Sequence, residues 1–246
     1  MTEFLIPEGV DINARNEEGL TALFVACYAQ NSSLVEALIA RGADVNKGTE
    51  DGWTPLMAAA MKGNHQIATL LVDAGADARL CNKDIECNAF MYAAQVGSVE
   101  IVRLLAPLSD LNGQSKDGWT ALMLASQNNH LSVVSVLLDE LKGINVNAVD
   151  VRGFTALLYA SQENHLDVVK LLLAHGANPN LADRNGMTAL HMVCLLKYFK
   201  MVELLVQAGA NVNAKNAVGA TPLKISVLAQ HQEIVELLVA NGAKEE

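Results

Sequence analysis

The sequence predicts an all-α solenoid of about seven repeats, and three observations support this fold class. First, a residue able to cap a helix recurs at steps of 32 to 35 residues, at Thr21, Thr54, Asn88, Thr120, Thr155, Thr188 and Thr221. Second, a glycine stands two residues before six of these seven positions. Third, the apolar stretches between them are too short to form stable helices alone, so the units must stack to bury their apolar faces.

Residues 150–180 show the elements of one unit in order. Gly153 permits the positive backbone angle that a tight turn needs, and Thr155 is placed to cap a first short helix. Asn164 and the histidine after it are expected to break that helix. A second apolar stretch, residues 166–173, predicts a second helix, which Gly176 ends as a C-terminal cap.

The repeat predicts one elongated domain, 1–246, divided into complete units at residues 16–48, 49–82, 83–114, 115–149, 150–182, 183–215 and 216–246. A partial unit, residues 1–15, precedes them, because residues 9–13 (G-V-D-I-N) repeat the tail of a unit. This partial unit either covers the first complete repeat or belongs to a longer protein, and the residues leave both possibilities open.

Two units depart from the regular pattern. In unit 83–114, Glu86 replaces the turn glycine and Asn88 replaces the capping threonine. Pro107 falls in the last turn of the second helix of that unit and is expected to shorten it, because proline cannot donate a backbone hydrogen bond. Unit 115–149 carries a two-residue insertion at about residues 139–143, which a loop can accommodate.

Four short motifs resemble the ankyrin repeat: T-P-L-M-A-A-A at residues 54–60, G-A-D-V-N at 42–46, G-A-N-V-N at 209–213 and T-A-L-H at 188–191. The resemblance covers nearly the whole chain. It implies helix-turn-helix units joined by β-hairpin or loop tips. It also implies that partners dock on the tips and on the exposed side of the first helices.

Composition restricts the class of partner and the compartment. The formal net charge of −10 argues against binding to the phosphate backbone of nucleic acid and favours a cationic partner. No apolar run reaches the length of a membrane span, so we expect no membrane partner. The four cysteines are interpreted as free thiols, with Cys27 and Cys194 buried in one register of the repeat, which suits the cytoplasm or nucleus. A secreted effector is not excluded.

The sequence shows none of the motifs that carry enzyme chemistry, such as G-x-S-x-G, H-E-x-x-H or a phosphate-binding glycine loop. We therefore predict a protein that is not an enzyme and that uses no metal or cofactor. The histidines are interpreted as structural, because most of them fall at repeated positions in the turn between two helices. His191 resembles the family's histidine that forms hydrogen bonds within its own repeat.

The resemblance assigns partner contacts to two sets of positions. The tip positions are Glu17, Glu18, Leu20, Glu50, Asp51, Trp53, Asp84, Lys116, Trp119, Arg152, Phe154, Arg184 and Met187. The first-helix positions are Tyr28, Met61, Gln127, Gln162, Leu195, Leu196 and Leu228.

Three features of these sets suggest how a partner binds, each with an alternative. The acidic tips of the first repeats suggest that a basic segment binds there, or they form a solvated acidic face. Trp53 and Trp119 occupy one register as anchors, or their rings cover the neighbouring tip. Leu195 and Leu196 form a contact site with Leu228, or they only overlap the next repeat.

We predict a monomeric protein–protein interaction scaffold that binds a protein or peptide. The alternative is a regulatory or targeting domain of a larger enzyme or secreted effector, whose activity lies outside these residues.

Overall fold

The computed structural model describes residues 9–244, and within that range it contains 14 α-helices and no β-strand. Of the predicted partial unit 1–15, residues 1–8 lie outside the described residues. The helices follow one another in pairs along the chain. The prediction of an all-helical solenoid is confirmed.

The chain divides into two compact units, residues 1–117 and 118–246. The helices of the first unit are α1 (Ala22–Tyr28), α2 (Ser32–Ala40), α3 (Pro55–Met61), α4 (His65–Asp73), α5 (Ala89–Val96) and α6 (Val99–Leu105). Those of the second are α7 (Ala121–Gln127), α8 (Leu131–Ser135), α9 (Ala156–Gln162), α10 (Leu166–Ala174), α11 (Ala189–Leu195), α12 (Phe199–Gln207), α13 (Pro222–Leu228) and α14 (Gln232–Ala240).

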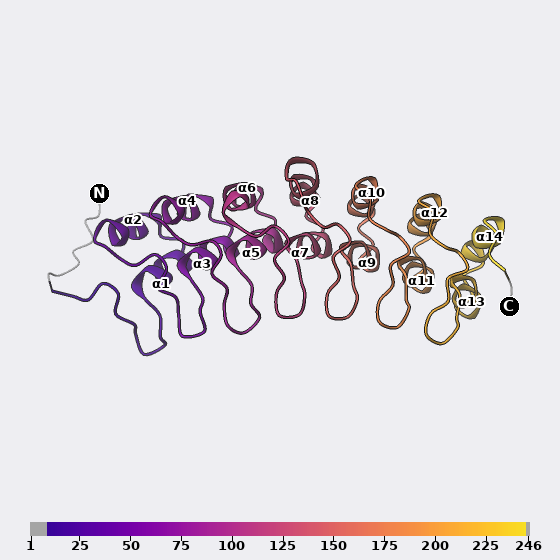
Figure 1. The fold of residues 1–246 in the computed structure, drawn as a ribbon, viewed down its shortest axis with the longest axis horizontal. Coiled ribbons are helices and arrows are strands. Elements are labelled where there is room, and N and C mark those ends of the chain that lie inside the picture. Colours follow the sequence, from indigo (N-terminus) through magenta and orange to yellow (C-terminus); the bar gives the residue numbers. More distant parts are fainter. Residues whose placement is uncertain (1–8, 245–246) are drawn as a thin grey trace. The chain divides into compact units, whose positions relative to one another are not determined.

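Within each unit the helices form two rows. In the first unit α1, α3 and α5 pack side by side next to the loop tips, while α2, α4 and α6 form the row farther from them (Figure 1). In the second unit α7, α9, α11 and α13 form the row next to the tips (Figure 1). The first helices of the repeats are therefore the ones that a partner can reach together with the tips.

The predicted caps begin all seven first helices. At each of these positions the side-chain oxygen accepts a hydrogen bond from the backbone N–H three residues later, at donor–acceptor distances of 3.0 to 3.5 Å. Asn88 does this as well as threonine does, which explains why the substitution leaves α5 intact. His191 completes a capping box with Thr188, and its Nε2 lies 3.1 Å from the carbonyl oxygen of Ala220 in the next repeat.

The tips are loops and not β-hairpins with paired strands. Three isolated bridges, Arg15–Thr21, Cys81–Asn88 and Ala182–Thr188, are the only β pairing in residues 9–244. In six of the tips the first residue donates its backbone N–H across the loop, and the oxygen of its polar side chain accepts a backbone N–H of the same loop. These side chains belong to Asn16, Thr49, Asn82, Asp150, Asp183 and Asn216.

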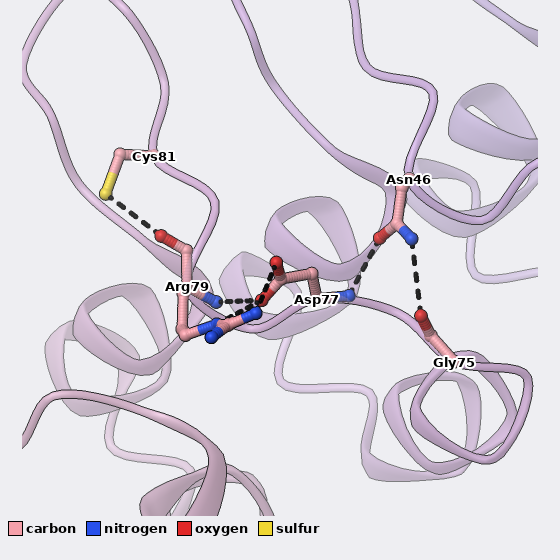
Figure 2. Close-up of polar contacts among 5 residues, drawn as sticks. All are labelled: Asn46, Gly75, Asp77, Arg79 and Cys81. Carbon is pink, nitrogen blue, oxygen red and sulfur yellow. Dashed lines mark hydrogen bonds and ion pairs between the residues drawn. The ribbon is translucent and has the colours of Figure 1, made fainter.

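Asparagines link the tails of successive repeats on the side of the second helices. The carboxamide oxygen of Asn46 accepts from the backbone N–H of Asp77 at 2.8 Å, and its nitrogen donates to the carbonyl of Gly75 at 3.3 Å (Figure 2). Asn147, Asn180 and Asn213 repeat this pair of bonds. Arg79 occupies the equivalent position one repeat after Asn46 and instead binds Asp77 of its own loop (Figure 2).

The two irregular units change their second helices. Helix α6 ends at Leu105 and continues as a 3₁₀ turn, Ala106–Leu108, which contains Pro107. The predicted shortening is confirmed. Helix α8 has five residues and continues as a π-helical segment, Val136–Glu140. The insertion predicted at residues 139–143 thus begins in a widened helical turn.

Three of the four cysteines are buried free thiols, and Cys81 is exposed. Burial raises the pKa of Cys27 and of Cys194 to about 12, and raises that of Cys87 to about 11. The prediction that Cys27 and Cys194 are buried is confirmed. Their thiolate forms, which are the reactive forms, are scarce at neutral pH.

We expect only Cys81 to react promptly with Ellman's reagent at pH 8 in the folded protein, although burial also raises its pKa. All four thiols should react after unfolding in guanidinium chloride. A Cys81→Ser variant should lose the prompt reaction, and its three remaining thiols should still react after unfolding. Prompt reaction of Cys27 or Cys194 in the folded protein would contradict the burial seen here.

Candidate partner-binding surface

The structure places every predicted partner-binding residue on a tip or on a first helix, and none of them is buried. The repeat period alone therefore identified exposed positions correctly. The structure also shows which of them lie together, and it does so separately for the two units.

In the first unit, seven of the predicted residues line one groove with a volume of about 410 Å³. We call it the acidic groove; its lining residues are Glu18, Leu20, Phe24, Tyr28, Thr49, Glu50, Asp51, Trp53 and Met61. Phe24 and Thr49 were not predicted. An aromatic residue at position 24, where the other repeats have methionine, leucine, histidine or lysine, is the feature of the sequence that could have identified Phe24. Glu17 and Asp84 are exposed but do not line the groove.

Aromatic rings form one part of the acidic groove. The rings of Phe24 and Tyr28 are nearly parallel, with centroids 6.4 Å apart. Trp53 stacks on Tyr92 of the next repeat with centroids 4.9 Å apart. The Tyr92 hydroxyl accepts from Asn82 at 3.3 Å, and burial raises the pKa of Tyr92 to about 12, so this supporting ring stays neutral. The Trp53 indole is thus packed on one face against Tyr92.

Three carboxylates border these rings, and none has an ion-pair partner within residues 9–244. They belong to Glu18, Glu50 and Asp51, all exposed. The Cγ of Glu50 lies 3.3 Å from where a Cβ on Gly19 would stand, so this glycine lets the Glu50 side chain lie against the neighbouring tip. Lys83 donates to the backbone carbonyl of Glu50 at 2.7 Å. The acidic groove therefore combines an aromatic surface with three carboxylates that form no ion pair in residues 9–244, and the Lys83 ammonium lies beside the tip that carries Glu50.

In the second unit a different cluster surrounds Tyr159. Its ring stacks on Trp119 with centroids 4.3 Å apart and packs against Phe154 at 5.0 Å. The Tyr159 hydroxyl donates to the fully buried carboxylate of Asp150 at 2.6 Å and accepts from the Arg152 guanidinium. Burial raises the pKa of Tyr159, and the hydrogen bond with Tyr159 raises the pKa of Arg152. We call these five residues the Tyr159 cluster.

The exposed charge of the Tyr159 cluster is the positive guanidinium of Arg152, whereas the acidic groove exposes carboxylates. The Arg152 side chain is 59% exposed and lies over the Phe154 ring, with its Cζ 4.9 Å from the ring centroid. Its hydrogen bonds hold it in place. The two halves of the predicted site thus differ in charge although both are built around a tryptophan.

The tryptophan rings pack on the next repeat, while their role as anchors for a partner stays a prediction. Trp53 and Trp119 are partly exposed, yet one face of each covers a tyrosine of the next repeat. Tyr92 and Tyr159 follow their tryptophans by 39 and 40 residues. This spacing of one repeat plus six or seven residues is the pattern that could have predicted the pairs.

A third surface is apolar. Leu195 and Leu196 at the end of α11 are 55% and 41% exposed, and Leu228 at the end of the adjacent α13 is 75% exposed. Val218 and Val227 of the last repeat are also exposed. Leu195, Leu196 and Leu228 are therefore not covered by the next repeat within the described residues.

The remaining predicted residues are exposed or partly exposed but lie outside these three surfaces: Lys116, Gln127, Gln162, Arg184 and Met187. Some have structural contacts. The Gln127 carbonyl lies 2.9 Å from Nε2 of His165, and the Arg184 backbone N–H donates to the carbonyl of Arg152.

Residues 9–244 contain no group of three or more His, Cys, Asp or Glu side chains arranged to hold a metal ion. No helix in that range has both the length and the apolar character to cross a membrane.

Stacked helix pairs with exposed loop tips define a helical repeat solenoid. A family profile described as "Ankyrin repeats (3 copies)" matches residues 1–84, 74–150, 90–183 and 157–246. The chain belongs to the ankyrin-repeat family, whose members are generally protein–protein interaction modules.

Two relatives show the extent of the similarity. The crystal structure of the ankyrin repeat domain of Bcl-3, described as a unique member of the IkappaB protein family, superposes with a TM-score of 0.77 at 29% identity. The superposition covers 91% of this chain and all of that domain. A mitochondrial disaggregase from Bos taurus is 49% identical over 51 residues, which are 20% of this chain and 8% of that protein.

Proposed function

We propose that this chain is a non-enzymatic, monomeric interaction module that binds a protein or peptide partner carrying a basic segment. The basic segment lies in the acidic groove. The observation that carries the proposal is the groove itself, where Glu18, Glu50 and Asp51 have no ion-pair partner in the described chain and border the Trp53 ring. Free, buried thiols support a reducing compartment such as the cytoplasm or nucleus.

The distribution of charge supports a basic partner at the first unit. Residues 1–117 contain 16 Asp and Glu against 8 Lys and Arg, a net charge of −8, while residues 118–246 contain 11 against 9, a net charge of −2. A concentrated negative field attracts a cationic segment and speeds its association at low salt. The aromatic rings of the groove then supply apolar contact area once the segment has docked.

Reversing the charge of the groove tests this proposal. The probe is a fluorescein-labelled dodecapeptide with three arginines separated by alanine and leucine, measured by fluorescence anisotropy at 50 and 200 mM NaCl. We expect the triple variant Glu18→Lys, Glu50→Lys, Asp51→Lys to bind it at least roughly ten-fold more weakly at 50 mM NaCl. The native protein should lose affinity as salt increases, and the variant should lose much less.

The matched control carries the same change of charge on the second helices of the same unit: Glu36→Lys, Asp73→Lys and Glu100→Lys, all exposed. These residues lie on α2, α4 and α6, in the row away from the tips. We expect the control to bind within about two-fold of the native protein, because charges farther apart than the Debye length are screened. Equal losses in both triple variants would show a general charge effect and no groove.

A further inference from the structure

We infer that the acidic groove contains one subsite, between Trp53 and Tyr28, that binds the guanidinium group of a single arginine of the basic segment. This inference rests on the proposed function and makes it more specific. It predicts that one arginine of a bound peptide accounts for most of the affinity, whereas a diffuse acidic face would share the affinity among all the cations.

The chain's own Lys62 shows that a cation is stable on this aromatic surface. The Lys62 ammonium lies 3.9 Å from the centroid of the Tyr28 ring. Such a contact is electrostatic, since the face of an aromatic ring carries partial negative charge. Tyr28 is exposed and lines the groove, so the ring that holds Lys62 also borders the proposed subsite.

Trp53 offers the second ring, and the structure orients it. Tyr92 covers one face of the indole at 4.9 Å, and Trp53 still lines the groove. Indole is the strongest of the aromatic side chains in cation–π contacts. Since Tyr92 is itself buried, Trp53 cannot turn away freely, and little side-chain entropy is lost when a ligand stacks on it.

Arginine fits this site better than lysine does. A planar guanidinium can stack on the indole while its N–H donors, which lie in the plane of the group, point to carboxylates at the rim. Glu18, Glu50 and Asp51 supply those carboxylates with no competing ion pair in residues 9–244. An ammonium is more strongly hydrated and makes no bidentate pair, so it gains less from the same surroundings.

Lys62 competes with the incoming arginine in this arrangement. Its ammonium occupies one ring of the site and adds a like charge beside the ligand. Replacing Lys62 with methionine keeps an unbranched side chain but removes the charge. The variant Lys62→Met is therefore expected to bind an arginine peptide about three-fold more tightly. Loss of a favourable contact next to the groove would instead weaken binding.

The Tyr159 cluster is a natural comparison, because Trp119 stacks on Tyr159 as Trp53 stacks on Tyr92. There, however, the cation is the chain's own Arg152, which lies over Phe154 and is hydrogen-bonded to Asp150 and Tyr159. The cluster already holds a guanidinium among its rings. The charge of Arg152 would repel a second arginine at Trp119, so Trp119 provides a matched control.

The experiment uses the same dodecapeptide with its three arginines replaced one at a time by citrulline, which keeps the shape and removes the charge. We expect one replacement to weaken binding roughly ten-fold and the other two to weaken it two- to three-fold. Lysine at the sensitive position should restore only part of the affinity. With Trp53→Leu or Tyr28→Leu protein, the three citrulline peptides should become nearly equal in affinity, whereas Trp119→Leu should change nothing.

The outcomes separate the inference from the proposed function. Equal losses for all three citrullines, together with a large loss for the Glu18, Glu50, Asp51 triple variant, would overturn the arginine subsite and leave the basic-segment proposal standing. Full recovery with lysine, or weaker binding by Lys62→Met, would also overturn the subsite. No binding of any arginine peptide by the native protein would overturn both. Tyr28 is exposed, so Tyr28→Leu keeps the test valid if Trp53→Leu fails to fold.

Discussion

Replacing Asp150 with alanine is expected to lower the free energy of unfolding by about 3 kcal/mol, since it breaks a buried hydrogen-bond network. The Asp150 carboxylate is fully buried and accepts from the Tyr159 hydroxyl at 2.6 Å, from the backbone N–H of Arg152 at 2.8 Å and from that of Phe154 at 2.7 Å. Alanine leaves these donors without a partner. Urea denaturation followed by circular dichroism measures the loss.

Two control variants separate the contributions to this effect. Asp183 accepts the same two kinds of backbone N–H groups in the next tip, but it binds no buried phenol, so Asp183→Ala is expected to cost only about 1 kcal/mol. Asp150→Asn retains the acceptor oxygen and should cost less than Asp150→Ala, because asparagine already serves this position at Asn16 and Asn216. Equal costs for Asp150→Ala and Asp183→Ala would show that Tyr159 and Arg152 contribute nothing.

Replacing Gly118 with alanine is the second large expected effect, with a loss of about 3 kcal/mol in the free energy of unfolding. Gly118 has a φ angle of +84°, in the left-handed region that L-residues avoid. A Cβ there would stand 2.8 Å from the Cα of Asp150 and 3.0 Å from the backbone nitrogen of Val151. These are backbone atoms, so the next tip must shift to admit a methyl group. Thermal unfolding and urea denaturation both report the change.

Gly219 provides the matched control, because it occupies the same register in the last repeat with a φ angle of +73°. No atom lies within 4 Å of the position where its Cβ would stand, so Gly219→Ala carries only the cost of the left-handed backbone, about 1 kcal/mol. The difference between the two variants measures the contact between neighbouring tips. If Gly118→Ala were no more destabilising than Gly219→Ala, that contact would have no energetic weight.

The regular fold could be predicted because its determinants are local. Thr155 caps a helix by binding an N–H three residues later, and Asn164 ends that helix with a φ angle of +60°. Neither interaction needs a distant part of the chain, and each recurs at a fixed period. The same holds for Pro107, which ends α6 early. The tips were predicted as β-hairpins or loops, and the structure has loops. They are closed by single backbone bonds such as that from Asn16 to Leu20, and by side-chain oxygens such as that of Asn16.

The candidate site was predictable only as a set of exposed positions. The repeat period determines which residues lie on tips and first helices, and all the predicted residues are exposed or partly exposed there. Their role in binding stays a prediction. The sequence analysis identified neither Phe24 as a lining residue nor the cation–π contact of Lys62 with Tyr28. A groove wall or a cation–π contact of this kind depends on side chains from two repeats.

The sequence by itself determined the class of fold and the sign of the charge on the first tips, because caps, glycine stops and composition are local or additive. Only the tertiary structure decided that Glu18, Glu50 and Trp53 line one groove while Arg152 is held over Phe154 in another unit. The reason is that stacking and charge compensation depend on distances between repeats, and those distances are set by packing.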